Sequence, residues 1–355
     1  MRRTLVSIVI GMGMGVMACL LLLGGLFVFY PNWLDDLITK PVPISATLPP
    51  PSRTPTSPAL HVSPAPPQAS PTPLPTLPPL PNSACGGPEQ MTIALLGVDD
   101  RTQNYSKATR TDAITLVNVN FARRSASLLS FPRDLYVPLP NLEDQNITQD
   151  RLNTAFEFGE IYKVPGGGPA EFKSTIEWNF GLRVDRYIMV NFGAFEAAID
   201  ALGGIDVDVP RAIYDPTYPD NNSGTLVFSL PAGRQHMDGR TALRYARTRH
   251  QDSDYYRIKR QQLVLLAVRD KMFSPQVIPQ IPSLIATLGQ LARTDLSATE
   301  IASLACIGAQ IDRSAINAQT IDTTMVIPWI TPGGAQVSVP NRDAIGPVVD
   351  TFLGR

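Results

Sequence analysis

The residues best suited to chemistry lie between Leu243 and Gln262 (LRYARTRHQDSDYYRIKRQQ), a segment with five arginines and one lysine. On a helix, Arg257, Arg260 and Gln261 occupy positions i, i+3 and i+4 and share one face, with Asp254 one turn earlier. The helix continues as the apolar LVLLAVRDKM. We therefore predict that its polar first half opens into a cleft while its second half is core.

Upstream, Arg247 and Arg249 are two residues apart, so an extended chain would place both on one side. A guanidinium is a planar fork of donors that fits phosphate or carboxylate, and several converging ones indicate a polyanionic ligand. The alternative is that these arginines bind no ligand and form a solvated surface joined by salt bridges.

Three apolar segments upstream can bring further charges to this ligand. Residues 91–98 (MTIALLGV) predict a buried strand, and 113–121 and 125–131 alternate as strands joined by a hairpin-length gap. In an antiparallel meander, the end of the first strand, the start of the second and the end of the third meet at one sheet edge. The charged residues at those points are Asp99, Arg101, Arg110, Asp112, Arg133 and Asp134; chance clustering of surface charge is the alternative.

This edge could hold a metal ion and a diphosphate. Asp99 and Asp112 together suit Mg²⁺, which commonly takes one or two carboxylates plus waters and phosphate oxygens. Phosphoryl transfer needs in-line positioning and charge neutralisation, which a metal and arginines supply. The arginines proposed to clamp the diphosphate are Arg133, Arg247, Arg249, Arg257 and Arg260.

The rest of the chain after residue 85 interleaves strands with helices. We predict strands at 185–192, 205–210 and 324–328, and helices at 192–204, 274–292 and 297–310. This order indicates an α/β fold in which helices flank a mixed central β-sheet in α-β-α layers.

The first thirty residues predict a membrane anchor. Residues 5–30 carry no charge and exceed the roughly 20 residues that a helix needs to cross a bilayer, whereas a cleaved signal peptide has a shorter apolar region. Arg2 and Arg3 precede this span and Asp35 and Asp36 follow it, so the N-terminus should be cytoplasmic. We expect a single-pass protein of the cell membrane whose remaining chain is extracytoplasmic.

Between the anchor and the folded domain lies a proline-rich stretch. Residues 41–81 contain sixteen prolines and can build no core; at about 3.1 Å per residue they could reach on the order of 120 Å. The expected organisation is an anchor (1–30), a linker (31–84) and a catalytic domain (85–355).

Composition excludes several classes of function. The net charge of −1 gives no bulk attraction to nucleic acid. Three histidines and no CxxC pair make a zinc site improbable, and no Ser-His-Asp or Cys-His grouping stands out. The run 166–168 lacks the Lys-Ser/Thr of a P-loop and predicts a flexible loop. Cys85 and Cys306 could form a disulfide outside the cell, but their spacing leaves this open.

Seven segments resemble, in order, the motifs of the LytR-CpsA-Psr family of cell-envelope glycopolymer transferases. They are GVDDR (97–101), RTDAITLVNVN (110–120), SFPRDLYVPLP (130–140), RLNTAFEFG (151–159), DALGGIDVDVP (200–210), AGRQHMDGRTALRYARTRH (232–250) and DYYRIKRQQ (254–262). The resemblance spans about 97–272, and a single membrane span ahead of it is also the family's arrangement.

The resemblance implies an extracytoplasmic phosphotransferase. Such enzymes move a glycopolymer from undecaprenyl pyrophosphate to peptidoglycan, typically to the C6 hydroxyl of N-acetylmuramic acid, and release undecaprenyl phosphate. The implied partners are therefore the lipid-linked glycopolymer, peptidoglycan and the cytoplasmic membrane, with no nucleic acid.

By motif position, Asp99 and Asp112 match the magnesium-linked acids of the family. The matches to its pyrophosphate-binding positions are Arg133, Arg247, Arg249, Arg257 and Gln261, with Arg101 and Arg110 supporting the same edge. Asp99, Arg133 and Arg257 are the expected catalytic residues. The family's polyprenyl tunnel implies that the apolar stretches 187–202 and 263–272 line a cavity, although any single residue there could be ordinary core.

The sequence leaves several assignments open. Asp100 follows Asp99, so which acid faces the metal is ambiguous, and Arg151 stands where lysine is common. Residues 273–355 carry no family motif, and Asp99, Asp134 and Asp254 are all possible general bases. Two alternative functions remain: a polyprenyl-pyrophosphate phosphatase or pyrophosphatase, and a non-catalytic lipid-binding regulator of the envelope.

Overall fold

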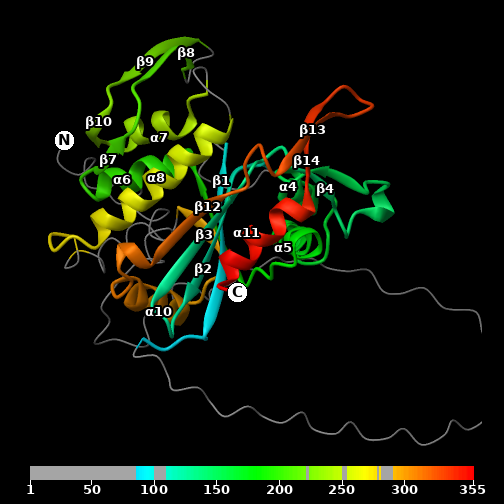
Figure 1. The fold of residues 1–355 in the computed structure, drawn as a ribbon, viewed down its shortest axis with the longest axis horizontal. Helices are drawn as coiled ribbons and strands as arrows, with labels where there is room; N and C mark the ends of the chain where they lie inside the picture. The colour runs from blue at the N-terminus through cyan, green and yellow to red at the C-terminus, as the bar shows by residue number, and fades with distance from the viewer. Residues whose placement is uncertain (1–84, 100–108, 221–223, 250–253, 278–279, 281–290) are drawn as a thin grey trace, which may run out of the picture. The chain divides into compact units, whose positions relative to one another are not determined.

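A six-stranded mixed β-sheet with helices on both faces forms the centre of the domain, in a computed structural model that describes residues 85–99, 109–220, 224–249, 254–277, 280 and 291–355 (Figure 1). The strand order is β11-β6-β1-β2-β3-β12. Its strands are β1 (Gln90–Val98), β2 (Thr111–Asn120), β3 (Ser125–Phe131), β6 (Arg186–Asn191), β11 (Ala292–Thr294) and β12 (Ile316–Thr320).

The first three strands form the predicted antiparallel meander. β1 pairs with β2, and β2 with β3, both antiparallel. On either side of this meander β6 joins β1 in parallel and β12 joins β3 in parallel, while β11 closes the other edge antiparallel to β6. The sheet is therefore mixed, as the alternation of strands and helices predicted.

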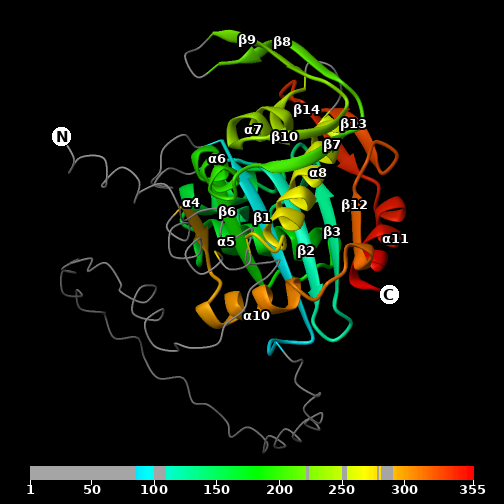
Figure 2. The ribbon, with the colours of Figure 1, turned by 90° about the vertical axis from the view of Figure 1, so that its left-hand side faces the viewer.

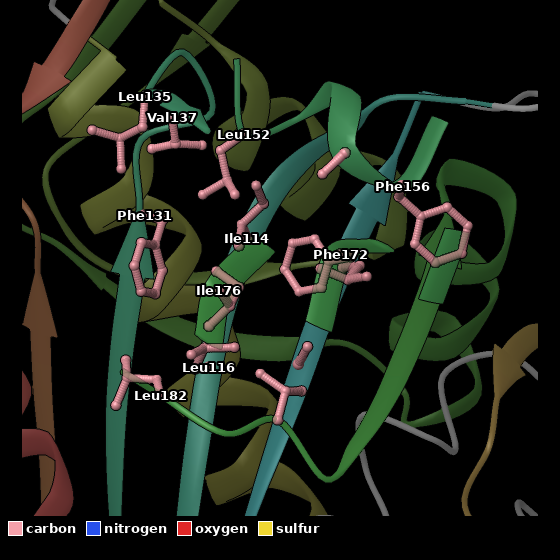
Figure 3. Close-up of a cluster of buried hydrophobic side chains, with 14 of the residues drawn as sticks. Ile114, Leu116, Phe131, Leu135, Val137, Leu152, Phe156, Phe172, Ile176 and Leu182 are labelled. Atoms are coloured by element: carbon pink, nitrogen blue, oxygen red, sulfur yellow. The ribbon is translucent and has the colours of Figure 1, made fainter. Parts of the chain in front are cut away.

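Side chains of β1 divide between the two faces of the sheet, because successive residues of a strand point in opposite directions. Ala94 and Leu96 pack into one core (Figure 3), and Ile93 and Leu95 into another. Both faces are thus covered, which explains why residues 91–98 are apolar without interruption.

Helices cover the two faces in separate groups. The face of Ala94 and Leu96 is covered by α4 (Thr154–Ile161), α5 (Gly167–Phe180) and α11 (Arg342–Leu353). On the other face lie α6 (Phe192–Ala201), α7 (Gly239–Arg247), α8 (Asp254–Met272) and α10 (Ala298–Gly308), of which the first three stand together in Figure 2.

Four small two-stranded antiparallel sheets stand outside the central sheet. They pair β4 (Tyr136–Pro138) with β5 (Gln149–Arg151), β7 (Ile205–Val209) with β10 (Gly233–Met237), β8 (Ile213–Pro219) with β9 (Thr225–Leu230), and β13 (Val326–Ile330) with β14 (Gln336–Pro340). Short 3-10 helices occur at Glu143–Gln145 and Arg313–Ala315.

Of three further local predictions, the first was confirmed, the second lies largely outside the described residues and the third was wrong. The late strand predicted at 324–328 is present as β13, but it belongs to a separate hairpin, and the strand that joins the central sheet is β12. The helix predicted at 274–292 lies mostly outside the described residues, and its last residue begins β11. The run 166–168 is no flexible loop, since Gly168 lies in the first turn of α5, where a Cβ would come within 2.5 Å of Phe156.

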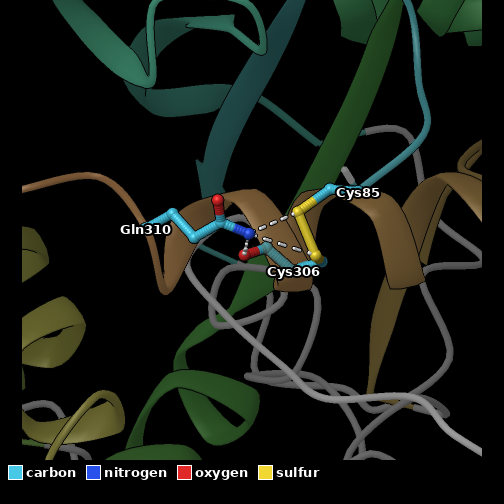
Figure 4. The surroundings of a disulfide bond; sticks show 3 residues. All are labelled: Cys85, Cys306 and Gln310. Atoms are coloured by element: carbon cyan, nitrogen blue, oxygen red, sulfur yellow. Dashed lines mark hydrogen bonds between the residues drawn. A yellow bond between two sulfur atoms is a disulfide. The ribbon is translucent and has the colours of Figure 1, made fainter. Parts of the chain in front are cut away.

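A disulfide joins Cys85 to Cys306 of α10, with their Cα atoms 5.4 Å apart (Figure 4). The Gln310 side-chain amide donates to the sulfur of Cys85 at 2.8 Å. The bond, which the sequence left open, ties the point where the domain begins to the helix layer on one face of the sheet.

No helix in the described part of the chain is long and apolar enough to span a bilayer. The predicted span, residues 5–30, and the predicted linker up to residue 84 lie outside the described residues.

Candidate active site

The predicted gathering of charges at one sheet edge is present at the ends of β1, β2 and β3. In the β1–β2 ladder Gly97 faces Ala113 and Val98 faces Thr111, so Asp112 is the extra residue of a β-bulge. Bulges are common beside active sites because they re-aim a side chain. Here Asp112 has no partner residue on β1, and its carboxylate meets residues from other segments.

Asp112 is held from two sides. It accepts a hydrogen bond of 2.7 Å from Nη1 of Arg133, which follows β3, and one of 3.0 Å from the amide of Asn153. Asn153 is a residue that the sequence did not single out; it lies within the RLNTAFEFG motif, and that is the only signal that could have indicated it. The meander therefore brings Asp112 and Arg133 together, as predicted.

The other predicted residues of this edge differ in their placement. Asp99 directly follows β1, is exposed, and lines the cavity described below. Arg110 is exposed and pairs with Glu157 of α4 at 3.1 Å, and it is absent from the described residues that line the cavity. Its predicted contact with pyrophosphate stays a prediction, and in the structure its side chain meets Glu157. Arg101 lies outside the described residues.

Arg257 reaches the same edge from α8. Its guanidinium is buried, donates to the backbone carbonyl of Asp112 at 3.2 Å, and contacts the two carboxylate oxygens of Asp254 at 2.9 and 3.0 Å. Its Nε is buried and makes no hydrogen bond within the described part of the chain. Two arginines, one that follows β3 and one from α8, thus converge on Asp112.

The environments of these two guanidiniums shift their pKa in opposite directions. Burial, reinforced by the nearby positive charge of Arg133, lowers the pKa of Arg257. Burial also acts to lower the pKa of Arg133, but the carboxylates of Asp112, Asp134 and Asp254 outweigh it and raise that pKa. Both residues remain cationic at neutral pH because arginine starts from so high a pKa.

Arg247 and Arg249 lie at the C-terminal end of α7 and just beyond it. Arg247 ends α7 instead of lying in extended chain, and its guanidinium sits 4.0 Å above the ring of Phe192 while donating to the Tyr218 hydroxyl at 3.2 Å. Burial raises the pKa of Tyr218, which keeps the phenol neutral. Arg249 is half exposed, 3.9 Å from Asp254. Both arginines line the cavity.

Arg260 has a different position from the one predicted. It is buried, and its Nε donates to the carbonyl of Tyr245 at 3.0 Å while Nη2 donates to the carbonyl of Thr248. These carbonyls belong to the end of α7, where backbone acceptors lack helical partners. Arg260 is absent from the described cavity lining, and these contacts tie it to the end of α7, while its predicted contact with the diphosphate stays a prediction. Gln261 does line the cavity and donates to the Ala246 carbonyl at 3.4 Å.

A cavity of about 350 Å³ runs from this charged edge into the layer between the sheet and α6 to α8. Its mouth is charged and its interior is apolar. The apolar lining comes largely from the stretches predicted for it, namely Val190, Phe192, Phe195, Ala198 and Ile199 from the first, and Val264, Leu265 and Val268 from the second.

Two further polar residues of the lining were missed by sequence reasoning. Asp215 of β8 is fully buried and accepts a 2.5 Å hydrogen bond from the hydroxyl of Thr248. This bond joins the β8–β9 hairpin to the α7–α8 turn, so it helps to fix the cavity wall between Arg247 and Arg249. Nothing in the local sequence indicated the pairing, because the two residues are 33 positions apart.

The residues present fit a magnesium ion that completes its coordination with substrate. Asp99 and Asp112 line the same cavity and offer the hard carboxylate oxygens that Mg²⁺ prefers. The described residues contain no group of three or more His, Cys, Asp or Glu able to hold a metal by themselves. For an ion held at Asp99 and Asp112, phosphate oxygens and water would supply the remaining ligands.

The chain is similar to known proteins in sequence and in fold. The model of the LytR_cpsA_psr family matches residues 82–344. The polyisoprenyl-teichoic acid–peptidoglycan teichoic acid transferase TagU of Oceanobacillus iheyensis is 32% identical over 218 residues, which are 61% of this chain and 62% of that protein. TagT of Bacillus subtilis, a transferase of the same description, is 32% identical over 213 residues, 59% and 62% of the two chains.

Solved structures show the same fold. The crystal structure of B. subtilis TagV aligns with a TM-score of 0.60 at 25% identity, covering 75% of this chain and 98% of that one. A structure of TagT bound to LIIa-WTA aligns with a TM-score of 0.55 at 25% identity, covering 75% and 92%. The chain spans somewhat less than two thirds of the length of the curated relatives named above. With its ordered motifs, its mixed sheet and a family match over most of its length, the chain belongs to the LytR_cpsA_psr family.

Proposed function

We propose that this protein is an extracytoplasmic phosphotransferase that moves a glycopolymer from undecaprenyl pyrophosphate to peptidoglycan and releases undecaprenyl phosphate. The observation that carries the proposal is that Arg133 and Arg257 converge on Asp112 at the mouth of an apolar cavity. A ligand that fits both the arginines and the apolar cavity has a doubly charged head and a hydrocarbon tail. The names of the similar transferases and of the TagT complex support the same class of substrate.

In this mechanism the polyprenyl tail enters the cavity and the pyrophosphate lies against the guanidiniums. An acceptor hydroxyl attacks the phosphorus that carries the polymer. A new P–O bond forms, the bridging P–O bond breaks with its electron pair on undecaprenyl phosphate, and the hydroxyl proton passes to a carboxylate. The arginines neutralise the charge that collects on the phosphate oxygens, the main requirement of such a transfer.

Asp99, Asp134 and Asp254 were the possible general bases, and the contacts of each carboxylate show which of them is available to accept a proton. Asp134 lies 3.4 Å from Arg133 and 3.5 Å from Arg151, and Asp254 is paired with Arg257. Asp99 lines the cavity itself. We therefore assign Asp99 to receive the proton directly or through one water, and Asp134 and Asp254 to hold the arginines in place.

Residues 5–30 would anchor the enzyme in the cell membrane, with the domain outside. The Cys85–Cys306 disulfide supports this location, since disulfides persist in oxidising compartments. The substrate lipid would then be drawn from the same membrane.

A bulky side chain in the cavity should weaken binding of the polyprenyl tail without affecting binding of the pyrophosphate. Ala198 is buried and lines the cavity, so Ala198→Phe should raise the KM for a polyprenyl-pyrophosphate donor at least roughly tenfold, the effect of losing about two buried methylenes at about 0.8 kcal/mol each. Binding of inorganic pyrophosphate, measured by calorimetry, should not change.

The control for this variant is Ala305→Phe, which places the same bulk at a buried alanine of α10 outside the described cavity lining. It should cost stability without changing the KM for the donor. An unchanged KM in Ala198→Phe would show that the tail does not enter this cavity.

Magnesium dependence can be tested at Asp99. When bound at Asp99 and Asp112, Mg²⁺ would neutralise phosphate oxygens. Asp99→Asn should lower transfer, because Asp99 is also the assigned proton acceptor. It should raise the Mg²⁺ concentration for half-maximal residual transfer at least roughly tenfold, because loss of even an outer-shell partner costs 10–100-fold in metal affinity. Mn²⁺ binding followed by EPR should weaken in parallel.

Glu89→Gln provides a matched control, because Glu89 is an exposed acid at the opposite end of β1. It should leave both the Mg²⁺ requirement and Mn²⁺ binding as they are. Full activity of the wild type in excess chelator would exclude a metal from the mechanism.

A further inference from the structure

The β13–β14 hairpin carries large apolar side chains that the fold leaves exposed. Ile327 is 57% exposed, Trp329 40% and Ile330 62%. The hairpin belongs to the part of the chain without a family motif, and its strands pair only with each other in the described sheets. A tryptophan left open in this way indicates a contact surface, since aromatic anchors dominate recognition.

This hairpin is fastened to the segment that follows Arg133. The Ser338 amide donates to the Asp134 carbonyl at 3.0 Å, and Leu135 and Ser338 form a β-bridge. Figure 1 shows β13 and β14 beside β4. The hairpin is therefore coupled through the backbone to the residue immediately after a catalytic arginine.

Arg151 adds a second connection between the hairpin and the active site. Its guanidinium donates to the Gln336 carbonyl at 3.3 Å and lies 3.5 Å from Asp134, which in turn lies 3.4 Å from Arg133. A chain of ion pairs and one hydrogen bond thus links Arg133 to the β13–β14 hairpin.

Two aromatic rings pack together where the β13–β14 hairpin meets β4. Tyr136 of β4 and Trp329 of β13 have ring centroids 5.4 Å apart with planes inclined at 52°. Tyr136 is three residues from Arg133, and three residues of chain span at most about 11 Å. The aromatic pair is thus within the length of a short oligosaccharide from the reacting phosphate.

We propose that Tyr136 and Trp329 form a sugar-binding platform that holds the glycan strand of the acceptor while its hydroxyl reaches the active site. This inference rests on the proposed transferase function and names the surface that receives its second substrate. Pyranose rings have apolar C–H faces that lie on aromatic rings, and hydroxyls at their edges that bond to polar groups. The platform offers both, with aromatic faces beside Arg151 and Asp134.

The test uses the full-length protein in detergent micelles with soluble peptidoglycan glycan fragments as acceptor. Trp329→Ala should raise the KM for the acceptor roughly tenfold, as expected for loss of an aromatic anchor, and leave the KM for the lipid donor unchanged. Trp329→Phe, which keeps an aromatic face, should restore most of the affinity. Trp178→Ala is the matched control, since Trp178 is 67% exposed on α5 and lies outside this hairpin.

Glycan binding is also measured without transfer, by calorimetric titration of the same fragments into wild type and Trp329→Ala. Unchanged acceptor KM and binding in Trp329→Ala would overturn the platform while leaving the transferase function intact. If wild type transfers nothing, the transferase function fails, and the titration alone decides whether the platform binds glycan. Quenching of Trp329 by brominated lipids in liposomes, without glycan binding, would instead make the hairpin a membrane contact.

Discussion

Arg257→Ala will lower the rate of glycopolymer transfer on the order of 10²–10³-fold, the effect of removing one preorganised donor from a developing charge. Arg257 is buried at the mouth of the cavity, and its Nε has no hydrogen-bond partner within the described part of the chain. A pyrophosphate oxygen would provide that partner. Rates with a defined lipid-linked oligosaccharide donor, measured at saturating acceptor, give the comparison.

Two controls distinguish loss of this donor from loss of the fold. Arg257→Lys keeps a positive charge but loses the planar fork, so its activity should be only partly restored. Arg183→Ala removes an arginine whose side chain is 80% exposed and which pairs with Asp185 away from the described cavity lining, and it should be as active as wild type. Normal turnover in Arg257→Ala with an unchanged melting temperature would contradict the proposal that Arg257 binds the pyrophosphate.

Cys306→Ser will lower the free energy of unfolding by about 2–5 kcal/mol, the usual cost of removing a native disulfide. The bond closes a loop between residues 221 positions apart, and a long loop gains much freedom in the unfolded chain when it opens. At roughly 2–4 °C per kcal/mol for a domain of this size, the melting temperature should fall clearly in a calorimetric scan.

The same bond can be removed in two other ways, which supply the controls. Cys85→Ser and the double variant should match Cys306→Ser, because each lacks the same single crosslink. Reductant should shift the melting temperature of wild type and leave all three variants unaffected. A wild type that is indifferent to reductant would show that the disulfide contributes little to stability.

The meander and its charged edge could be predicted because the signals are local. Residues 91–98 are apolar and the two strands after them are separated by a short gap, so the connectivity alone places Asp112 near Arg133. The apolar stretch of α8 indicated the cavity wall for the same reason, since its pattern lies within one helix.

The remaining features depend on contacts between distant segments. β12 reads INAQT, and its mostly half-buried or exposed residues give no apolar pattern by which an edge strand could be recognised. Arg260 resembles its neighbours on the helix face, but the carbonyl groups that it meets belong to α7. Arg110 pairs with Glu157, 47 residues away. In each case the contact depends on a partner that the local sequence does not indicate.

The most direct test of the central claim incubates the full-length protein with a polyprenyl-pyrophosphate oligosaccharide, Mg²⁺ and peptidoglycan fragments, and examines the products by mass spectrometry. We predict oligosaccharide joined to muramic acid through a phosphodiester, with one polyprenyl phosphate released for each bond formed. Release of free oligosaccharide phosphate without attachment, at the same rate with and without peptidoglycan fragments, would contradict the account and make the protein a hydrolase.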